Sequence, residues 1–342
     1  MTTPTTPTRK RRSWSRFTEA KAPSEYEAVS HDLHWHYKPG EPPWEMSPRW
    51  FWNEWYMKYR NESPFFCSDW NRFRDPDKLV YRTYIARQEQ GEVYLDGLDE
   101  EFESQHAFAE MGSRWVDVLS STYTPFRYVG HALMMTATYV MHMAPSSYIS
   151  NCAAYQAGDE LRRVQRIAYQ TRLLQIARQD DTIGDDRTKW EQADQWQPLR
   201  RCLEELLVVR DWGEAFTRLN FVVKPMVDAA FNVALADAAE RNGDLLTAMM
   251  HRHLQSDSER SLAWSTALVK VALADKPDNA DVLAGWAEDL APATFEAVLD
   301  AIAPLTKDPE KPSDVGTVRR AIGRACATAV QGAGLTAPAQ LE

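Results

Sequence analysis

The stretch that decides the fold is Asp159-Glu-Leu-Arg-Arg-Val-Gln165, in the middle of a long segment from Tyr148 to Arg178. Apolar residues recur in this segment at spacings of three and four, which is the pattern of an amphipathic helix: Ala153, Ala157, Leu161, Val164 and Ala168. Helical bundles that hold two metal ions take ligands from such helices through Glu-x-x-His turns. Here Glu160 is followed three residues later by Arg163, and a guanidinium has no lone pair to donate to a metal. The stretch therefore indicates a helical subunit that supports a partner, and argues against a stand-alone metal catalyst.

The rest of the chain also carries helix signals. Serine, threonine or aspartate followed by proline marks three helix starts, and glycine or proline marks several ends. The predicted helices are Ser47 to Tyr59, Asp75 to Gln90, Thr124 to Pro145, Gln192 to Val209, Gly213 to Arg241 and Gly243 to Ala274, with short helices from Asp278 onward separated by Pro292, Pro304 and Pro309. No run of residues reads as a strand, and no solenoid repeat is present. The fold class is all-α.

Composition excludes several classes of protein. The net charge of −10 argues against a nucleic-acid surface, and the only basic run, Arg9 to Arg12, reads as a solvated tail. No apolar segment follows that run, so a secretory signal is not expected. The longest apolar run, Ala132 to Ala144, is too short to span a membrane. The cysteines are far apart and fit reduced thiols, which predicts a soluble cytoplasmic protein: Cys67, Cys152, Cys202 and Cys326.

Tryptophans gather near the N-terminus, where seven of the 13 lie within the first 70 residues. Prolines interrupt the same segment, so it predicts an extended arm with a short helix and little core of its own. Its rings either pack on the chain's own bundle or reach a partner. The candidates for a partner interface are Trp35, Trp44, Trp50, Trp52 and Trp55. The predicted organisation is a basic tail over 1–22, the arm over 23–75, a bundle over 76–275, and short helices with a tail over 276–342.

Histidine patterns do not predict a metal site. His106 forms a single Glu-x-x-His turn, whereas a di-iron bundle needs two such turns and two further glutamates. The cluster His31, His34 and His36 lacks further ligands at metal spacing. His251 and His253 are two apart on a helix and face different directions. A Gly-rich phosphate loop, a serine nucleophile elbow and a Cys-x-x-Cys pair are likewise missing from the sequence.

Several segments together resemble one family. They are Pro23-Ser-Glu-Tyr-Glu27, Asp69 to Tyr84, Tyr123-Thr-Pro125, Asn151-Cys-Ala153, Asp211 to Thr217, Lys224-Pro225 and Trp264 to Lys270. They resemble the β (small) subunit of the hydroxylase in bacterial multicomponent soluble di-iron monooxygenases, in the branch that oxidises toluene, alkenes and isoprene. The resemblance covers nearly the whole chain after the first dozen residues. Each segment alone is weak, and the set is specific.

The resemblance implies a ferritin-like bundle, of the kind found in the R2 subunit of ribonucleotide reductase. It also implies where the catalytic subunit's iron ligands would fall here: near His131, on Glu160 and Arg163, on Lys224 or Pro225, and on Ser258 and Ser261. Of these positions only Glu160 keeps a carboxylate, and paired iron ions need several anionic oxygens. We expect Glu160 and Arg163 to form a buried ion pair in the vacated centre, although an exposed pair is the alternative. Pro225 removes one helix hydrogen bond and should kink its helix.

The family resemblance further implies an assembly of two α, two β and two γ chains, with the di-iron centre in α. An effector protein, a Rieske-type ferredoxin and an NADH reductase would complete the system. This chain would then have neither catalytic residues nor a cofactor of its own. Two alternatives stay open: an iron-binding catalyst in its own right, and a helical scaffold unrelated to oxygenases. The identity of the hydrocarbon is left open too, because the substrate pocket would lie in another polypeptide.

Overall fold

A computed structural model describes residues 24–30, 51–339 and 341, and this part of the chain contains helices and loops but no strand. The α-helices are α1 (Glu25–Ser30), α2 (Phe51–Tyr56), α3 (Tyr81–Ser104), α4 (Ala107–Glu110), α5 (Ser113–Val118), α6 (Phe126–Met143), α7 (Ser147–Arg178), α8 (Asp186–Gln192), α9 (Gln197–Leu207), α10 (Trp212–Thr217), α11 (Lys224–Asp228), α12 (Leu235–Arg241), α13 (Leu245–Asp275), α14 (Asn279–Ala301), α15 (Pro304–Lys307) and α16 (Val315–Gly332). The predicted all-α class is confirmed.

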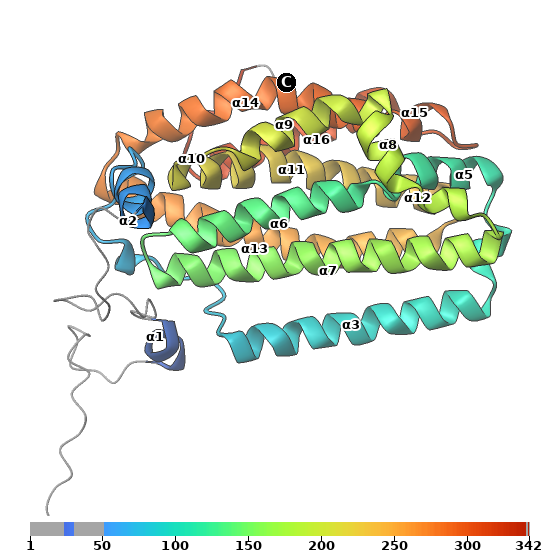
Figure 1. Cartoon of the computed structure of the whole chain (residues 1–342), viewed down its shortest axis with the longest axis horizontal. Helices are drawn as coiled ribbons and strands as arrows, with labels where there is room; N and C mark the ends of the chain where they lie inside the picture. The colour runs from blue at the N-terminus through green and yellow to red at the C-terminus, as the bar shows by residue number, and fades with distance from the viewer. Residues whose placement is uncertain (1–23, 31–50, 340, 342) are drawn as a thin grey trace, which may run out of the picture.

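Four long helical runs form the centre of the molecule (Figure 1). They are α6, α7, α13 and the continuous run from Trp212 to Arg241, in which α10, α11 and α12 are joined by the π-helical segments Arg218–Val223 and Ala229–Ala234. That run is apolar and long enough to cross a membrane by length and composition, but 89% of its apolar window is buried inside the molecule. It is therefore the core helix around which the other three pack. Pro225 lies in the first turn of α11, between the two π-helical segments.

The predicted boundaries of the central helices agree closely with the structure, because their caps are local. Ser146 accepts a hydrogen bond from the backbone N–H of Tyr148 at the start of α7, and Pro145 separates α6 from α7. Asp211 accepts hydrogen bonds from the N–H groups of Gly213 and Glu214 at the start of α10. Polar side chains that satisfy free N–H groups fix these helix starts.

The prediction of a helix beginning at Asp75 is wrong. The Asp75 carboxylate accepts hydrogen bonds from the N–H groups of Asp77 and Leu79, which closes a turn, and α3 begins later at Tyr81. The helix also continues to Ser104, well past Gln90. Aspartate before proline marks a turn as readily as a helix cap, and the sequence pattern does not distinguish the two.

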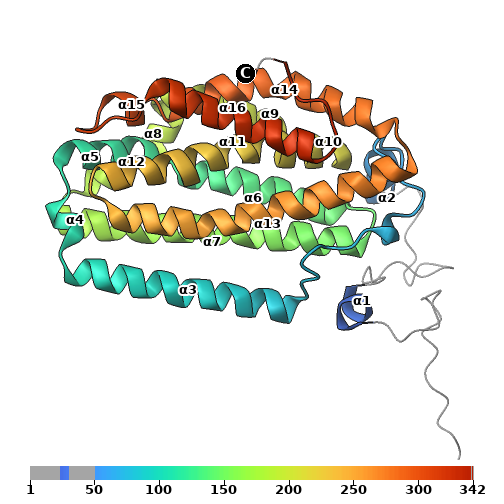
Figure 2. The same ribbon diagram turned by 180° about the vertical axis from the view of Figure 1, so that it is seen from behind.

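The prediction of short helices after Asp278 is also wrong. The structure has a 23-residue helix, α14, with Pro292 inside it, and an 18-residue helix, α16. Pro292 removes one helical hydrogen bond, but neighbouring side chains of α14 are buried, including Leu290 and Phe295. Apolar burial maintains the helix across the proline. Helices α14 and α16 cover one side of the bundle, and α3 lies along the other side (Figures 1 and 2).

Candidate functional site: the charged centre of the bundle

Four charged side chains meet at the centre of the bundle. Glu160 and Arg163 come from α7, and Lys224 and Asp228 come from α11; we call them the central quartet. Each is at most 5% exposed. Residues three apart in α7 and four apart in α11 lie on one face of a helix, so both pairs point into the same space.

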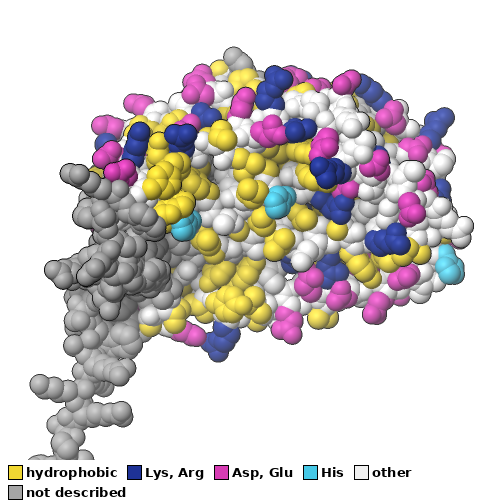
Figure 3. Space-filling model, in the orientation of Figure 1, with side chains coloured by type: hydrophobic (Ala, Val, Ile, Leu, Met, Phe, Trp, Pro, Cys, Tyr) yellow, Lys and Arg dark blue, Asp and Glu magenta, His cyan; other side chains and the backbone are white. Residues whose placement is uncertain are grey.

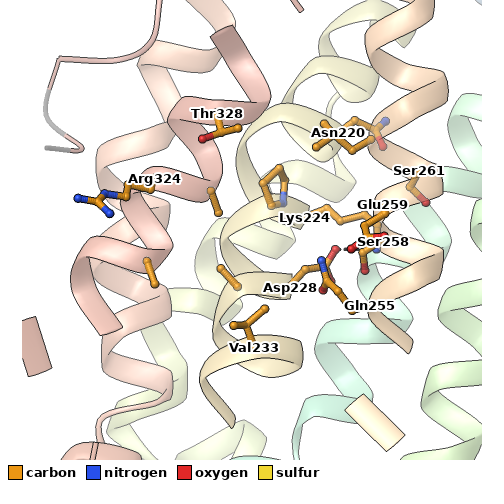
Figure 4. Close-up of a pocket in the computed structure, with 15 residues that line it drawn as sticks. Asn220, Lys224, Asp228, Val233, Gln255, Ser258, Glu259, Ser261, Arg324 and Thr328 are labelled. Atoms are coloured by element: carbon orange, nitrogen blue, oxygen red, sulfur yellow. Dashed lines mark ion pairs between the residues drawn. The ribbon is translucent and has the colours of Figure 1, made fainter. Parts of the chain in front are cut away.

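The quartet is linked by alternating charges. Lys224 Nζ lies 3.0 Å from Asp228 Oδ2 and also donates to Glu160 Oε1 (the Lys224–Asp228 pair is dashed in Figure 4). Arg163 Nη1 donates to Asp228 Oδ1 at 2.7 Å and lies 3.8 Å from Glu160 Oε2. The predicted buried pair of Glu160 and Arg163 is confirmed, but it is the longest contact of the four. The stronger partners are Lys224 for Glu160 and Asp228 for Arg163.

Electrostatics keeps Lys224 and Asp228 ionised despite their burial. Burial alone would lower the pKa of Lys224, but the carboxylates of Asp228 and Glu160 outweigh it and raise that pKa. Burial alone would raise the pKa of Asp228, and Lys224 and Arg163 outweigh it in the same way, so that pKa is lowered. The guanidinium of Arg163 also stacks on the Phe126 ring of α6, with 4.2 Å between Cζ and the ring centroid. Two positive and two negative charges therefore balance inside the core.

A chain of neutral polar groups borders the quartet. Asn232 donates a hydrogen bond to Ser258 Oγ, and its carbonyl oxygen lies 3.3 Å from Nδ1 of the fully buried His251. Burial, assisted by the charge of Arg163, holds the pKa of His251 well below its usual value, so the imidazole is neutral. Ser261 is buried and donates to the backbone oxygen of Asp257. These groups complete a polar core between the π-helical segment Ala229–Ala234, α13 and the quartet.

The donor set of this centre does not fit a pair of iron ions. Hard or borderline cations need several anionic oxygens and imidazoles, whereas here two carboxylates face an ammonium and a guanidinium. Both carboxylates already accept hydrogen bonds from those cations. In the described part of the chain, no three His, Cys, Asp or Glu side chains come together in a group that could hold a metal ion. The centre is therefore a closed ion cluster.

The structure separates the predicted ligand positions into two groups. Glu160, Ser258 and Ser261 are buried at the centre, as expected. His131 is exposed on the outer side of α6, so its expected place at the centre is wrong. Its neighbour Gly130 faces α7, where an added Cβ would meet Val164 at 2.8 Å.

Of the two candidates for the third position, Lys224 has its side chain at the centre. Pro225 is half-buried and lines a hollow between α11, α13 and α16, which Lys224 and Asp228 of the quartet also border (the labelled residues are shown in Figure 4). Asp228 was missed by the sequence reasoning, which counted a single carboxylate. The signal was available, because Lys224 and Asp228 are four apart on a helix and opposite in charge.

A second buried network lies on the α3 side of α7; we call it the α3 network. Asp159 pairs with Arg260 of α13 and accepts hydrogen bonds from Tyr84 and Gln88 of α3. Burial raises the pKa of Asp159 to about 7, although Arg260 opposes the shift. Along the same face, Arg162 binds Asp257 and Glu92, while Arg166 binds Glu92, Asp96 and Asp99. Helix α3 is therefore held to the bundle mainly through polar contacts.

The predicted interface tryptophans fall partly outside the described residues, since Trp35, Trp44 and Trp50 lie in the range 31–50. Trp52 is 45% exposed on α2. Trp55 is half-buried and donates a hydrogen bond to Tyr139 Oη of α6 at 3.2 Å. Trp55 therefore packs on the chain's own bundle, whereas the Trp52 ring is exposed at the surface. The four cysteines are free thiols and all buried.

Comparisons with known proteins agree with the bundle and its centre. The methane/phenol/alkene hydroxylase family matches residues 55–276. The chain is 41% identical over 300 residues to the hydroxylase component subunit β of the toluene-4-monooxygenase system of Ectopseudomonas mendocina, which covers 87% of this chain and 91% of that protein. It is similar to a solved structure of toluene 4-monooxygenase with toluene in the resting active site, with a TM-score of 0.81 and 39% identity over 86% of this chain and 97% of that one.

The large subunit of another hydroxylase component also matches. The large subunit of the hydroxylase component of propane 2-monooxygenase from Mycolicibacterium goodii is 26% identical over 210 residues, which is 59% of this chain and 38% of that subunit. The structural similarity confirms the predicted ferritin-like bundle. On these grounds the chain belongs to the methane/phenol/alkene hydroxylase family, as the β subunit of the hydroxylase component of a multicomponent monooxygenase.

Proposed function

We propose that this β subunit is non-catalytic and metal-free, and that it supports a di-iron α subunit. The complete enzyme would hydroxylate or epoxidise aromatic or alkene hydrocarbons, isoprene among them, with O₂ and electrons from NADH. The similarity to the toluene-4-monooxygenase subunit favours an aromatic substrate. The β subunit contributes a rigid helical body to which the catalytic chain binds.

The observation that carries this proposal is the central quartet. At the place where a bundle of this kind would hold metal, Lys224 and Arg163 supply positive charge from within the chain. A metal ion entering the centre would have to displace both cations from buried carboxylates and leave two positive charges unpaired. Unpaired charges in a protein interior cost several kcal/mol each, so the quartet opposes metal binding.

The assembly that we propose has two α, two β and two γ chains, with the di-iron centre in α. An effector protein, a Rieske-type ferredoxin and an NADH reductase would serve it as separate components in the cytoplasm. Support comes from the relatives' names, which include a "subunit beta" and a "large subunit" of hydroxylase components. We assign no nucleic-acid or membrane partner to the chain, in keeping with its net charge of −10 and its buried core helix.

Iron analysis of separated subunits tests the proposal. The chain is expressed alone and together with the large subunit of the same organism, and the iron content of each purified species is measured by mass spectrometry. We expect the isolated chain to carry no stoichiometric iron and all iron in the complex to follow the large subunit. Iron at one or more equivalents in the isolated chain would instead support a catalyst in its own right.

A further inference from the structure

Helix α7 carries its charges on the inside. Its five charged residues between Asn151 and Tyr169 are each at most 8% exposed: Asp159, Glu160, Arg162, Arg163 and Arg166. The exposed or half-buried side chains on its outer side over the same length are uncharged: Asn151, Ala154, Leu161, Gln165, Ala168 and Tyr169. A surface helix in water normally shows the opposite arrangement, with charged residues outside.

The adjoining helix α6 shows the same feature. It contains no Asp, Glu or Lys, and its single arginine, Arg127, pairs with Asp186 near the helix start. The exposed side chains from there to the end of the helix are His131, Met135, Thr138 and His142. These four, together with Leu161, Gln165 and Tyr169 of α7, form what we call the neutral face.

The neutral face lies on the side of the molecule seen in Figure 1. Figure 3 shows hydrophobic side chains gathered over α6 and α7 on this side, whereas Lys, Arg, Asp and Glu lie mainly towards the edges. Charged residues make up 26% of the whole chain, so their depletion along two neighbouring helices is a local property. Loss of charge from the centre of a surface patch is the compositional signature of a protein interface.

The neutral face has a hollow at its edge. It has a volume of about 330 Å³ and lies between α6 and α9, lined by Met135, Thr136, Thr138, Tyr139, His142, Leu206, Leu207 and Val209. Next to it, Tyr56 Oη lies 2.6 Å from His142 Nε2 and so joins α2 to the face. Phe51 and Trp52 of α2 are 56% and 45% exposed. A hollow lined mainly by apolar side chains is suited to receive a large apolar side chain of a partner.

We infer that the neutral face is the surface through which this subunit binds the large subunit of its hydroxylase. This inference rests on the proposed function. The large subunit of a relative matches 59% of this chain, so the partner is expected to present helices of the same fold to this helix pair. A second copy of this chain is less suitable, because two bodies of net charge −10 repel each other as they approach.

Charge placed on the neutral face tests the inference. The full-length chain, affinity-tagged, is co-expressed with the large subunit as wild type, as Met135→Glu and as Leu161→Glu. The matched control is Val315→Glu, which alters an apolar side chain that is 56% exposed on α16, on the other side of the molecule (Figure 2). Recovery of the large subunit, the mass of the complex, and the thermal midpoint of each isolated chain are measured.

We expect Met135→Glu and Leu161→Glu to lower recovery of the large subunit by about tenfold or more, because a carboxylate would be buried without a partner. Val315→Glu should keep wild-type recovery, and the thermal midpoints of all isolated chains should agree. Full recovery with the two face variants would overturn the inference, as would equal loss with Val315→Glu. The inference also fails if the isolated chain is a dimer that Leu161→Glu dissociates, or if the face variants unfold the isolated chain.

These outcomes are separable from failure of the proposed function. If the wild type binds the large subunit and lacks iron while the face variants bind it equally well, only the position of the interface is wrong. If the wild type holds stoichiometric iron or does not bind the large subunit, the proposed function itself is wrong.

Discussion

The two sides of α7 hold buried charges in different ways. On one side, the central quartet is enclosed by α6, α7, α11 and α13, and all four of its side chains are buried. On the other side, the α3 network reaches the solvent, since the side chains of Glu92 and Asp96 are 36% and 63% exposed. Salt screens the buried charges of the quartet much less than the partly exposed charges of the α3 network. The quartet therefore fixes the centre of the fold, and the α3 network attaches a helix that can open locally.

The largest effect should come from removing one member of the quartet. Lys224→Met leaves Glu160 and Asp228 with Arg163 as their only cation, which places an uncompensated negative charge in the core. We expect a loss of about 3–5 kcal/mol in the free energy of unfolding. Urea denaturation of the isolated chain measures it. Lys270→Met on the exposed side of α13 is the matched control and should be close to neutral.

A double variant shows whether charge balance is the cause. Adding Glu160→Gln to Lys224→Met leaves the pair of Arg163 and Asp228, which is neutral overall. The double variant should regain roughly half of the lost stability or more, because the two sites interact directly. If the losses of unfolding free energy simply add in the double variant, Lys224 acts through packing. The quartet would then not differ from the α3 network in the way described above.

The second effect concerns pH. The folded chain keeps His251 neutral, because burial and the charge of Arg163 lower its pKa, whereas the unfolded chain takes up a proton near the ordinary value of 6.5. Acid therefore stabilises the unfolded state, and the contribution of His251 is present above pH 6.5 and lost as the pH falls below it. Between pH 6.5 and 5, wild type should lose more stability than His251→Gln, by at most about 2 kcal/mol. Equal pH dependence of the two proteins would exclude His251 as the cause.

The smallest effect should appear in the α3 network. About 1 M salt shortens electrostatic screening to a few Å, so it should weaken the contacts of Glu92 with Arg162 and Arg166. We expect backbone amides of α3 to exchange hydrogen a few times faster, while those around the quartet keep their rates. Glu92→Gln should also speed this exchange, by lowering the free energy of local opening of α3 by about 1 kcal/mol or less. Glu100→Gln, at an exposed position of the same helix, serves as the control. If salt speeds hydrogen exchange equally in α3 and α11, the two regions do not differ in their sensitivity to salt.

The sequence predicted what depends on local pattern. The long helices of the bundle, the break at Pro145 and the burial of Glu160 and Arg163 follow from periodicity, capping and the family resemblance. The placement of His131 at the centre failed, because successive residues of a helix point about 100° apart and His131 is exposed where its neighbour Gly130 is buried. The partners of Asp159, Arg162 and Arg166 lie 65 or more residues away in the chain. Periodicity carries no information on such distant pairs, so the α3 network could not be predicted.

Because two π-helical segments flank α11, the orientation of α11 depends on the number of residues in each segment. A π turn contains one more residue than an α turn, so each segment is equivalent to a single inserted residue. Deleting one residue from Arg218–Val223 would allow an α turn to form and would rotate α11 against the helices before it. Lys224 and Asp228 would then leave the centre together, whereas a substitution removes only one of them. A point mutation therefore changes one central charge at a time, whereas the deletion of one residue here is expected to displace Lys224 and Asp228 together.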